Sequence, residues 1–287
     1  MKYYEQDNKI IMENPDSFDI EQILECGQCF RFNKLDFREY IIIACGKVLH
    51  IKQKDKEVVF YPCTKEDFEN IWTKYFELDR DYSKIKIVLS EDEILKKAVA
   101  FAPGIRILRQ DPWECLISFI ISQNNRIPMI KQVIKNISER YGEKSGDYFL
   151  FPTAEQLKKA TVEELMSCKT GFRAKYIIDA IKNISEKRVD FSELENLPTQ
   201  EVRQKLMMIK GVGEKVSDCV MLFSMDRKDV FPTDVWVKRV MEYFYFGGKD
   251  AKIKEIHKLA DEKFGKYAGF AQQYLFHYAR QMKIGIK

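Results

Sequence analysis

The sequence has no long apolar run, no internal repeat and no low-complexity tract. In its 287 residues, no hydrophobic stretch approaches the roughly 20 residues that a membrane helix needs. Its first seven residues are polar and mixed in charge, so we do not expect a secretory signal. Hydrophobic residues still make up 45% of the chain, which is enough for a core and excludes wholesale disorder. We expect a cytoplasmic protein of one large domain or two ordinary ones, with no membrane partner.

Cysteine and histidine are too few and too scattered for a disulfide framework or a zinc site. The seven cysteines form an odd, dispersed set, which is typical of reduced thiols in a cytosolic protein. Cys26 and Cys29 form a C-x-x-C pair, but a structural zinc site needs four ligands, commonly from two such pairs. The three histidines are dispersed as well. We therefore interpret residues 26–29 as a glycine-containing turn.

The net charge of +4 is small but unevenly distributed. Residues 1–100 carry 16 basic and 20 acidic side chains, whereas residues 101–287 carry 32 and 24. The excess of positive charge therefore lies in the last two thirds of the chain. This is only a mild indication of a polyanionic partner, since many domains reach such a charge without one.

Strand patterns dominate before residue 90 and helix patterns after it. Short β-branched or alternating runs at 39–44, 48–53 and 58–61, separated by tight turns, predict antiparallel strands. A capping box at Ser90–Glu93 and a proline start at Asp111–Pro112 each open a helix. Other helices are expected at 65–76, 127–141, 154–159, 162–167, 172–184, 200–207, 214–223, 235–245, 253–264 and 267–282. The predicted fold class is α+β, with an antiparallel β-sheet domain over 1–98 and a mainly α-helical domain over 99–287.

The stretch from Leu206 to Cys219 predicts two helices joined by a tight hairpin. Gly211 and Gly213 let the backbone bend sharply and approach another molecule closely. The exposed amides that begin the second helix, at Glu214, can hold a phosphate. This helix-hairpin-helix pattern is typical of sequence-independent binding to the DNA backbone. The hairpin alone fits an ordinary helix–helix turn equally well.

Lys215 in the second helix and Asp234, 19 residues later, resemble the catalytic pair of the helix-hairpin-helix superfamily of DNA base-excision glycosylases. In that superfamily a glycine- and proline-rich loop precedes an Asp. The resemblance implies that Lys215 is a nucleophile, because a lysine that has lost its proton can attack carbon. It implies that Asp234 stabilises positive charge developing on the sugar. Without the resemblance, Lys215 is a solvated helix lysine and Asp234 is an N-cap.

Four further blocks narrow the resemblance to the 8-oxoguanine DNA glycosylases. They are residues 26–31, 114–125, 171–176 and 268–276, in the family's order over nearly the whole chain. The resemblance implies an N-terminal sheet domain similar to the TATA-binding protein and a helical HhH-GPD glycosylase domain. The active-site cleft is then expected between two helical subdomains.

The resemblance assigns five residues to substrate binding, four of them to the recognition of a flipped base. The main-chain carbonyl of Gly27 accepts the N7–H of 8-oxoguanine and repels the N7 lone pair of guanine. Phe276 and Cys219 sandwich the base, and Gln272 reads its Watson–Crick edge. Trp236 stands where the family often has a phosphate-binding His. By periodicity alone, Phe276 and Cys219 are core residues and Gln272 is a surface polar residue.

Opposite the lesion, the resemblance assigns Asn124 and Arg173 to the orphaned cytosine and Phe172 to an aromatic wedge beside it. Met129 stands where the eukaryotic enzymes have an Arg that donates hydrogen bonds to this cytosine. A thioether donates none, so we expect relaxed specificity for the opposite base. Pro128 also departs from the family pattern.

No cofactor is expected to be required. The carbonyls of Met207, Ile209 and Val212 match hairpin positions that hold a monovalent or divalent structural cation in the family. No iron–sulfur cluster is expected, because no cysteine follows Cys219.

The predicted function is a bifunctional DNA glycosylase that excises 8-oxoguanine from duplex DNA and cleaves the strand by β-elimination through a Schiff base. Its expected partner is double-stranded DNA containing 8-oxoguanine, bound by a monomer that is nucleoid-associated if the source is prokaryotic. Two alternatives remain: a related glycosylase for another damaged purine, or a non-catalytic helix-hairpin-helix protein that binds DNA.

Overall fold

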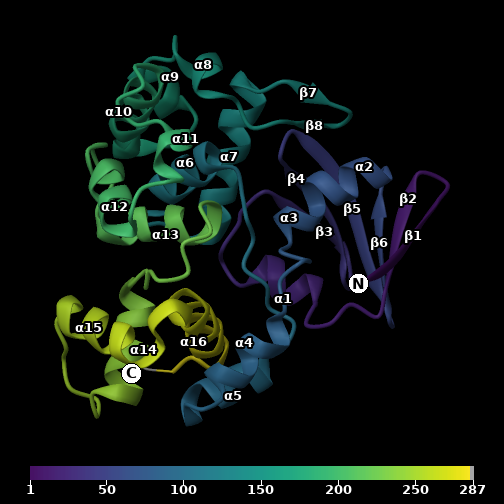
Figure 1. Cartoon of the computed structure of the whole chain (residues 1–287). Coiled ribbons are helices and arrows are strands. Elements are labelled where there is room, and N and C mark those ends of the chain that lie inside the picture. Colours follow the sequence, from purple (N-terminus) through teal and green to yellow (C-terminus); the bar gives the residue numbers. More distant parts are fainter. Residues whose placement is uncertain (285–287) are drawn as a thin grey trace.

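The computed structural model describes residues 1–284 and consists of a six-stranded antiparallel sheet beside a larger array of helices (Figure 1). The strands follow the order β1-β2-β6-β5-β4-β3, and every neighbouring pair is antiparallel. Their bounds are Lys2–Gln6 (β1), Lys9–Glu13 (β2), Phe32–Asp36 (β3), Glu39–Ala44 (β4), Lys47–Lys54 (β5) and Glu57–Tyr61 (β6). The α+β fold class is therefore confirmed.

The strand patterns predicted β4, β5 and β6 but missed the other three strands. β1 and β3 form the two edges of the sheet, and most of their residues are exposed. Polar residues are common on edge strands, so a hydrophobic alternation does not reveal them. The interior strand β2 does alternate, with Ile10 and Met12 buried, so its pattern was present in the sequence but was not recognised.

From residue 90 onward the chain is mainly helical, as predicted. Before residue 90, the helices at Ile20–Glu25 and Tyr82–Leu89 were not predicted. The helices are α1 (Ile20–Glu25), α2 (Lys65–Asp67), η1 (Phe68–Trp72), α3 (Thr73–Tyr75), α4 (Tyr82–Leu89), α5 (Glu93–Phe101), α6 (Pro112–Ser122), α7 (Ile127–Tyr141), α8 (Ala154–Leu157), α9 (Val162–Ser167), η2 (Gly171–Arg173), α10 (Ala174–Ser185), α11 (Phe191–Leu194), α12 (Thr199–Met207), α13 (Glu214–Ser224), α14 (Val235–Tyr245), α15 (Ile253–Phe264), η3 (Gly265–Tyr267) and α16 (Ala268–Met282). A small hairpin, β7 (Lys144–Ser145) and β8 (Tyr148–Phe149), follows α7. Among the described helices, none has the length and apolar character needed to cross a membrane.

Two predicted features differ from the structure in detail. Residues 65–76 are helical, but their middle, Phe68–Trp72, winds as a π-helix between α2 and α3. The predicted capping box at Ser90–Glu93 is wrong, because Ser90 ends α4 and Asp92 caps α5 by accepting two main-chain N–H bonds. Asp caps a helix as well as Ser does, and Asp92 stands immediately before the first helical residue.

The structure has two hydrophobic cores. The sheet covers one of them together with α1 and the α2–α3 segment. The other lies among the helices and includes the buried side chains of α4 and α5. Residue 98, the predicted end of the sheet domain, lies inside α5, and α5 packs on α16. Helices α4 and α5 thus belong to the helical core, and α16 packs against α5.

An ionic cluster joins the segment before α4 to the loop between α13 and α14. Asp226 accepts hydrogen bonds from Arg80 at 2.7 Å and from Arg109 at 2.8 Å. Buried Lys228 contacts the buried carboxylate of Glu77 at 3.0 Å. Burial opposes the ionisation of Asp226, but the cations of Lys228, Arg109 and Arg80 outweigh it and lower its pKa. The loop that leads into α14 is therefore anchored to the N-terminal part of the chain.

Candidate active site

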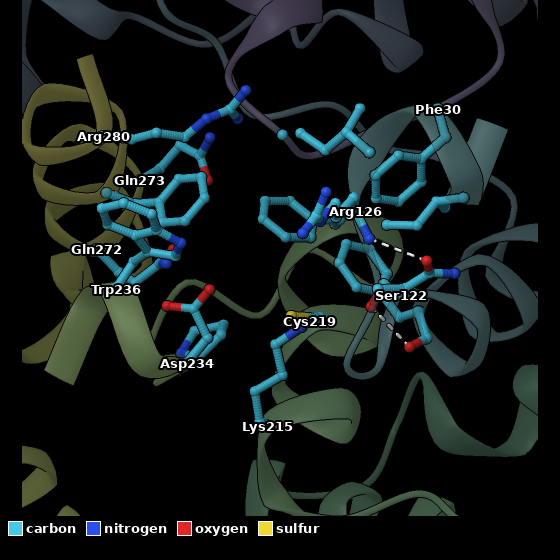
Figure 2. Close-up of a pocket in the computed structure, with 18 of the residues that line it drawn as sticks. Phe30, Ser122, Arg126, Lys215, Cys219, Asp234, Trp236, Gln272, Gln273 and Arg280 are labelled. Atoms are coloured by element: carbon cyan, nitrogen blue, oxygen red, sulfur yellow. Dashed lines mark hydrogen bonds between the residues drawn. The ribbon is translucent and has the colours of Figure 1, made fainter. Parts of the chain in front are cut away.

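Seven of the predicted site residues line one cavity of about 410 Å³. Its wall comes from segments far apart in the sequence: the turn after α1, helix α6 with its following loop, the helix-hairpin-helix element and α16 (Figure 2). The predicted residues in this wall are Gly27, Lys215, Cys219, Asp234, Trp236, Gln272 and Phe276. A cavity of this size lies within the usual range for small-molecule sites.

Lys215 lies in the first turn of α13, at the end of the hairpin. Its side chain is half-buried, and its Nζ lies 5.1 Å from the centre of the Phe119 ring. Cys219 follows one turn later on the same face of the helix and is buried. Burial raises the pKa of the Cys219 thiol to about 11, while the nearby Lys215 ammonium acts in the opposite direction. The thiol therefore faces the cavity as a neutral group.

Asp234 is the N-cap of α14, as the sequence predicted. Its Oδ1 accepts a hydrogen bond from the main-chain N–H of Val237 at 2.8 Å. The positive end of the helix dipole favours a negative charge at this position.

Trp236 lies in the first turn of α14, and the Arg239 guanidinium lies 5.7 Å from the centre of its ring. Figure 2 shows the carboxylate of Asp234 and the chain of Lys215 at the same end of the cavity.

Gln272 and Phe276 lie one turn apart on α16 and both face the cavity. Gln272 is 5% exposed, and its Oε1 is buried without a hydrogen-bond partner in the described part of the chain. An unmet buried acceptor costs about 1–3 kcal/mol, so this position favours a ligand that brings a donor. The arrangement suits a planar, polar ring between the Phe276 side and the Cys219 side.

Gly27 occupies a position that only glycine suits. Its φ is +85°, and a Cβ there would lie 3.0 Å from Cε1 of Phe276. Two buried glutamines that the sequence analysis missed hold this turn. Gln28 donates to two main-chain carbonyls and accepts from the N–H of Leu108, while Gln273 donates to the carbonyl of Cys26. A polar residue at an apolar helix position was the feature that could have revealed Gln273.

The predicted contacts to the opposite strand lie outside this cavity. Asn124 is exposed and adopts a left-handed conformation with φ of +47°. Phe172 is 56% exposed and Met129 is 46% exposed. Pro128 falls at the second position of α7, where its missing N–H has no helical partner to lose, so this departure does not disturb the helix start. Asn124, Phe172 and Met129 are therefore accessible to another molecule.

Arg173 differs from these residues because it is only 8% exposed. Its Nε donates to the carbonyl of Gln123 at 2.9 Å, and its Nη2 donates to that of Asn124 at 3.0 Å. Its Nη1 also donates to the carbonyl of Thr170. In this structure Arg173 therefore holds the loop that presents Asn124, and its contact with the orphaned cytosine remains a prediction.

The two hairpin glycines have different roles, which corrects the expectation that both bend the backbone. Gly211 has φ of +81°, and a Cβ there would lie 2.4 Å from the Tyr176 ring. Gly213 is the N-cap of α13 with φ of −102°, and the space beside it is open. Gly211 therefore makes the turn, whereas Gly213 leaves the start of α13 accessible.

The hairpin cation site stays a prediction. The carbonyl of Ile209 accepts the N–H of Val212 at 3.0 Å, which closes the turn. Within residues 1–284, no group of three or more His, Cys, Asp and Glu side chains is placed to hold a metal ion. A cation at the hairpin would therefore depend on main-chain carbonyls.

Comparison with known proteins matches both the N-terminal and the helical part of the chain to DNA repair families. Residues 10–116 match the 8-oxoguanine DNA glycosylase N-terminal domain, and residues 117–266 match the HhH-GPD superfamily base excision DNA repair protein. The chain belongs to the 8-oxoguanine DNA glycosylase family. The two family models together cover residues 10–266, which include the strands β3 to β6 and the helix-hairpin-helix element, but neither β1 nor the cavity residues of α16.

Relatives in the family cover most of the chain. This chain is 33% identical over 276 residues to the N-glycosylase/DNA lyase OGG1 of Arabidopsis thaliana. The alignment covers 87% of this chain and 74% of the relative. This chain is also 32% identical over 244 residues to the N-glycosylase/DNA lyase of Saccharomyces cerevisiae. That alignment covers 71% of this chain and 64% of the relative. A solved structure of the Clostridium acetobutylicum 8-oxoguanine glycosylase/lyase, bound to dsDNA containing cytosine opposite to 8-oxoG, is 44% identical. It superposes with a TM-score of 0.96 over 99% of both chains.

Proposed function

We propose that this protein is a bifunctional DNA glycosylase that removes 8-oxoguanine from duplex DNA and then cleaves the strand at the abasic site. The observation that carries the proposal is the placement of Lys215, Asp234 and Gly27 in the wall of one cavity. A nucleophile, a charge-stabilising carboxylate and a base-reading carbonyl are the groups that this chemistry needs. The cavity requires that the base be extruded from the helix first.

The neutral amine of Lys215 attacks C1′ of the deoxyribose. As the Nζ–C1′ bond forms, the C1′–N9 bond breaks, and the base leaves with the bonding electrons and takes up a proton. The ionised carboxylate of Asp234 stabilises the positive charge that develops on the sugar. Opening of the sugar ring and loss of the remaining amine proton give an imine. The imine acidifies the C2′ proton, and its loss breaks the C3′–O bond to the 3′ phosphate.

Recognition of the lesion depends on Gly27 and Gln272. The Gly27 carbonyl accepts the N7–H that 8-oxoguanine has and guanine lacks. Gln272 pairs with the Watson–Crick edge, which satisfies its buried Oε1. The amides at the open start of α13, next to Gly213, bind a DNA phosphate. A monovalent or divalent cation held by the carbonyls of the hairpin supports the same contact.

Relaxed specificity for the opposite base is the finer part of the proposal. Met129 is exposed beside the cavity and offers no hydrogen-bond donor. The exposed amide of Asn124 then remains to contact the orphaned base. The protein acts as a monomer on duplex DNA in the cytoplasm, at the nucleoid if the source is prokaryotic.

Borohydride trapping on duplexes with a panel of damaged bases tests the function. The wild-type protein should form a covalent adduct on 8-oxoguanine, and Lys215→Gln should bind the duplex but form none. Lys258→Gln, an exposed change on α15 outside the cavity, is the matched control and should trap normally. An adduct on another damaged purine alone would support the related-glycosylase alternative. An adduct on no substrate would support a non-catalytic DNA-binding protein.

A further inference from the structure

Arg280 lines the cavity but is not one of the residues to which the family resemblance assigns a role. It lies one turn after Phe276 on α16, and its side chain enters the cavity wall beside the turn that carries Gly27. A Cβ on Gly27 would lie 3.3 Å from the Arg280 Nη1. Figure 2 shows the guanidinium reaching from α16 toward the N-terminal segment drawn in purple. The end of this side chain is therefore next to the main chain that reads the lesion.

The Arg280 guanidinium makes no hydrogen bond or ion pair with residues 1–284. Its Nη1 is buried and has no hydrogen-bond partner in the described part of the chain. The other ionisable side chains that line the cavity are Arg126, Lys215, Cys219 and Asp234. Asp234 is engaged at the start of α14, and Cys219 is neutral as argued above. The cavity thus has an excess of positive charge and favours a ligand that is rich in acceptors.

Within residues 1–284, no neighbouring side chain pairs with the Arg280 Nη1. His277 is one turn back on the same helix, and its buried Nδ1 also lacks a partner among residues 1–284. Burial lowers the pKa of His277, the Arg280 charge lowers it further and Glu25 opposes both, so His277 adds no positive charge beside Arg280. Gln273 is directed to the carbonyl of Cys26. An unpaired donor held in a ligand cavity points to a contact that the ligand completes.

We propose that Arg280 is a specificity-determining residue that donates a hydrogen bond from Nη1 to an exocyclic oxygen beside N7 of the extruded base. The proposal rests on the proposed base-binding role of the cavity. In 8-oxoguanine the N7–H lies between two carbonyl oxygens, O6 and O8. The Gly27 carbonyl takes the proton, and the adjacent arginine supplies the donor that one of these oxygens requires. The edge of the base is then read by an acceptor and a donor side by side.

A contact to O8 would add to discrimination, because guanine has a C8–H in its place. A contact to O6 would strengthen binding of the base without separating the lesion from guanine. Both contacts use the same chemistry, a charged donor on a carbonyl oxygen. A phosphate contact by Arg280 would be a different role, because it would help every duplex equally.

The test compares wild-type protein with Arg280→Met and Arg280→Lys. Methionine keeps much of the length and no donor, and lysine keeps the charge without the planar fork. We expect Arg280→Met to lower kcat/KM for 8-oxoguanine excision about ten- to a hundred-fold, with Arg280→Lys in between. Cleavage of a preformed abasic site and affinity for a tetrahydrofuran duplex should stay unchanged, because neither substrate has a base. Arg188→Met, an exposed change beyond α10, is the matched control and should leave excision unchanged.

The outcomes separate the roles. Normal excision by Arg280→Met, or a parallel loss on excision, abasic cleavage and tetrahydrofuran binding, would overturn the proposal. If the wild-type protein neither excises 8-oxoguanine nor cleaves an abasic site, the proposed function itself has failed. 8-Oxoadenine, which keeps N7–H and O8 but has an amino group in place of O6, identifies the oxygen. A loss on both lesions assigns O8, and a loss on 8-oxoguanine alone assigns O6.

Discussion

The side-chain amide of Gln273 donates a hydrogen bond to the main-chain carbonyl of Cys26 across 3.0 Å. Gln273 is 2% exposed, so this bond lies in the interior between α16 and the turn after α1. Each partner of this bond is adjacent in sequence to a residue that is proposed to contact the base. Gln272 precedes Gln273, and Gly27 follows Cys26. One hydrogen bond therefore links the two sides of the cavity that contact different edges of the base.

Gln273→Met should misplace the Gly27 carbonyl. The change removes the donor and leaves the Cys26 carbonyl unpaired in the interior, which should cost about 1–3 kcal/mol of unfolding free energy. Excision of 8-oxoguanine should fall about ten-fold or more, while cleavage of a preformed abasic site should not change. Urea denaturation and single-turnover kinetics at a temperature where the variant is folded would check both effects. Equal losses on the two substrates would show a purely structural role.

Asp234→Asn should separate helix capping from catalysis. Asn caps a helix as well as Asp, so the hydrogen bond to the Val237 N–H and the stability should be kept. The negative charge is lost, and base release should slow by about a hundred-fold or more. Asp190→Asn, at the exposed N-cap of α11, is the matched control. A near-normal rate in single-turnover excision would reduce Asp234 to a capping residue.

The unmodified protein should excise 8-oxoguanine opposite adenine, guanine or thymine at rates close to that opposite cytosine. Met129 offers no donor, so a contact worth about 1–3 kcal/mol of discrimination is missing. Met129→Arg should restore part of the cytosine preference, because Pro128 leaves the start of α7 regular. Single-turnover rates against the four opposite bases measure the effect. A strong cytosine preference in the unmodified protein would contradict this account of Met129.

The Asp226 cluster should make stability depend on pH. The folded-state pKa of Asp226 is lowered, so its contribution is present above the ordinary Asp pKa of about 3.9 and is lost as pH falls through the lowered value. Asp226→Asn should therefore reduce the free energy of unfolding at pH 7 by about 1 kcal/mol, because its carboxylate is partly exposed and screened. The gap between wild type and variant should narrow as the solution is acidified. Urea denaturation between pH 7 and pH 3 would reveal a constant gap if the charge is irrelevant.

Local patterns in the sequence predicted most of the helices, three of the interior strands and the hairpin. The turn residues between Leu206 and Glu214 and the apolar runs at 39–61 act over a few neighbours, so their effect can be read without a structure. The N-cap at Asp234 is similarly local, because its carboxylate bonds to the N–H three residues later. The edge strands β1 and β3 lacked an apolar pattern and were visible only in the sheet.

The site was only partly visible in the sequence. Lys215, Asp234 and Gly27 could be named from motifs, since the resemblance aligned them with a known pattern. Their convergence in one cavity depends on the packing of α16 against the turn after α1, which joins residues almost 250 positions apart. Gln273 and Arg280 match no motif, and the only local signal was the polar side chain of Gln273 at an apolar helix position.

The sequence by itself determined the family chemistry and the local elements, because these depend on residue type and short spacing. Tertiary structure alone decided which polar groups are buried and whether a partner reaches them. Arg173 looked like a DNA contact in the sequence, yet in the fold it holds the carbonyls of Gln123 and Asn124. Arg280 was not singled out in the sequence, yet in the fold its Nη1 is buried beside Gly27 and has no partner among residues 1–284. Burial and partners are set by segments distant along the chain, which no local pattern records.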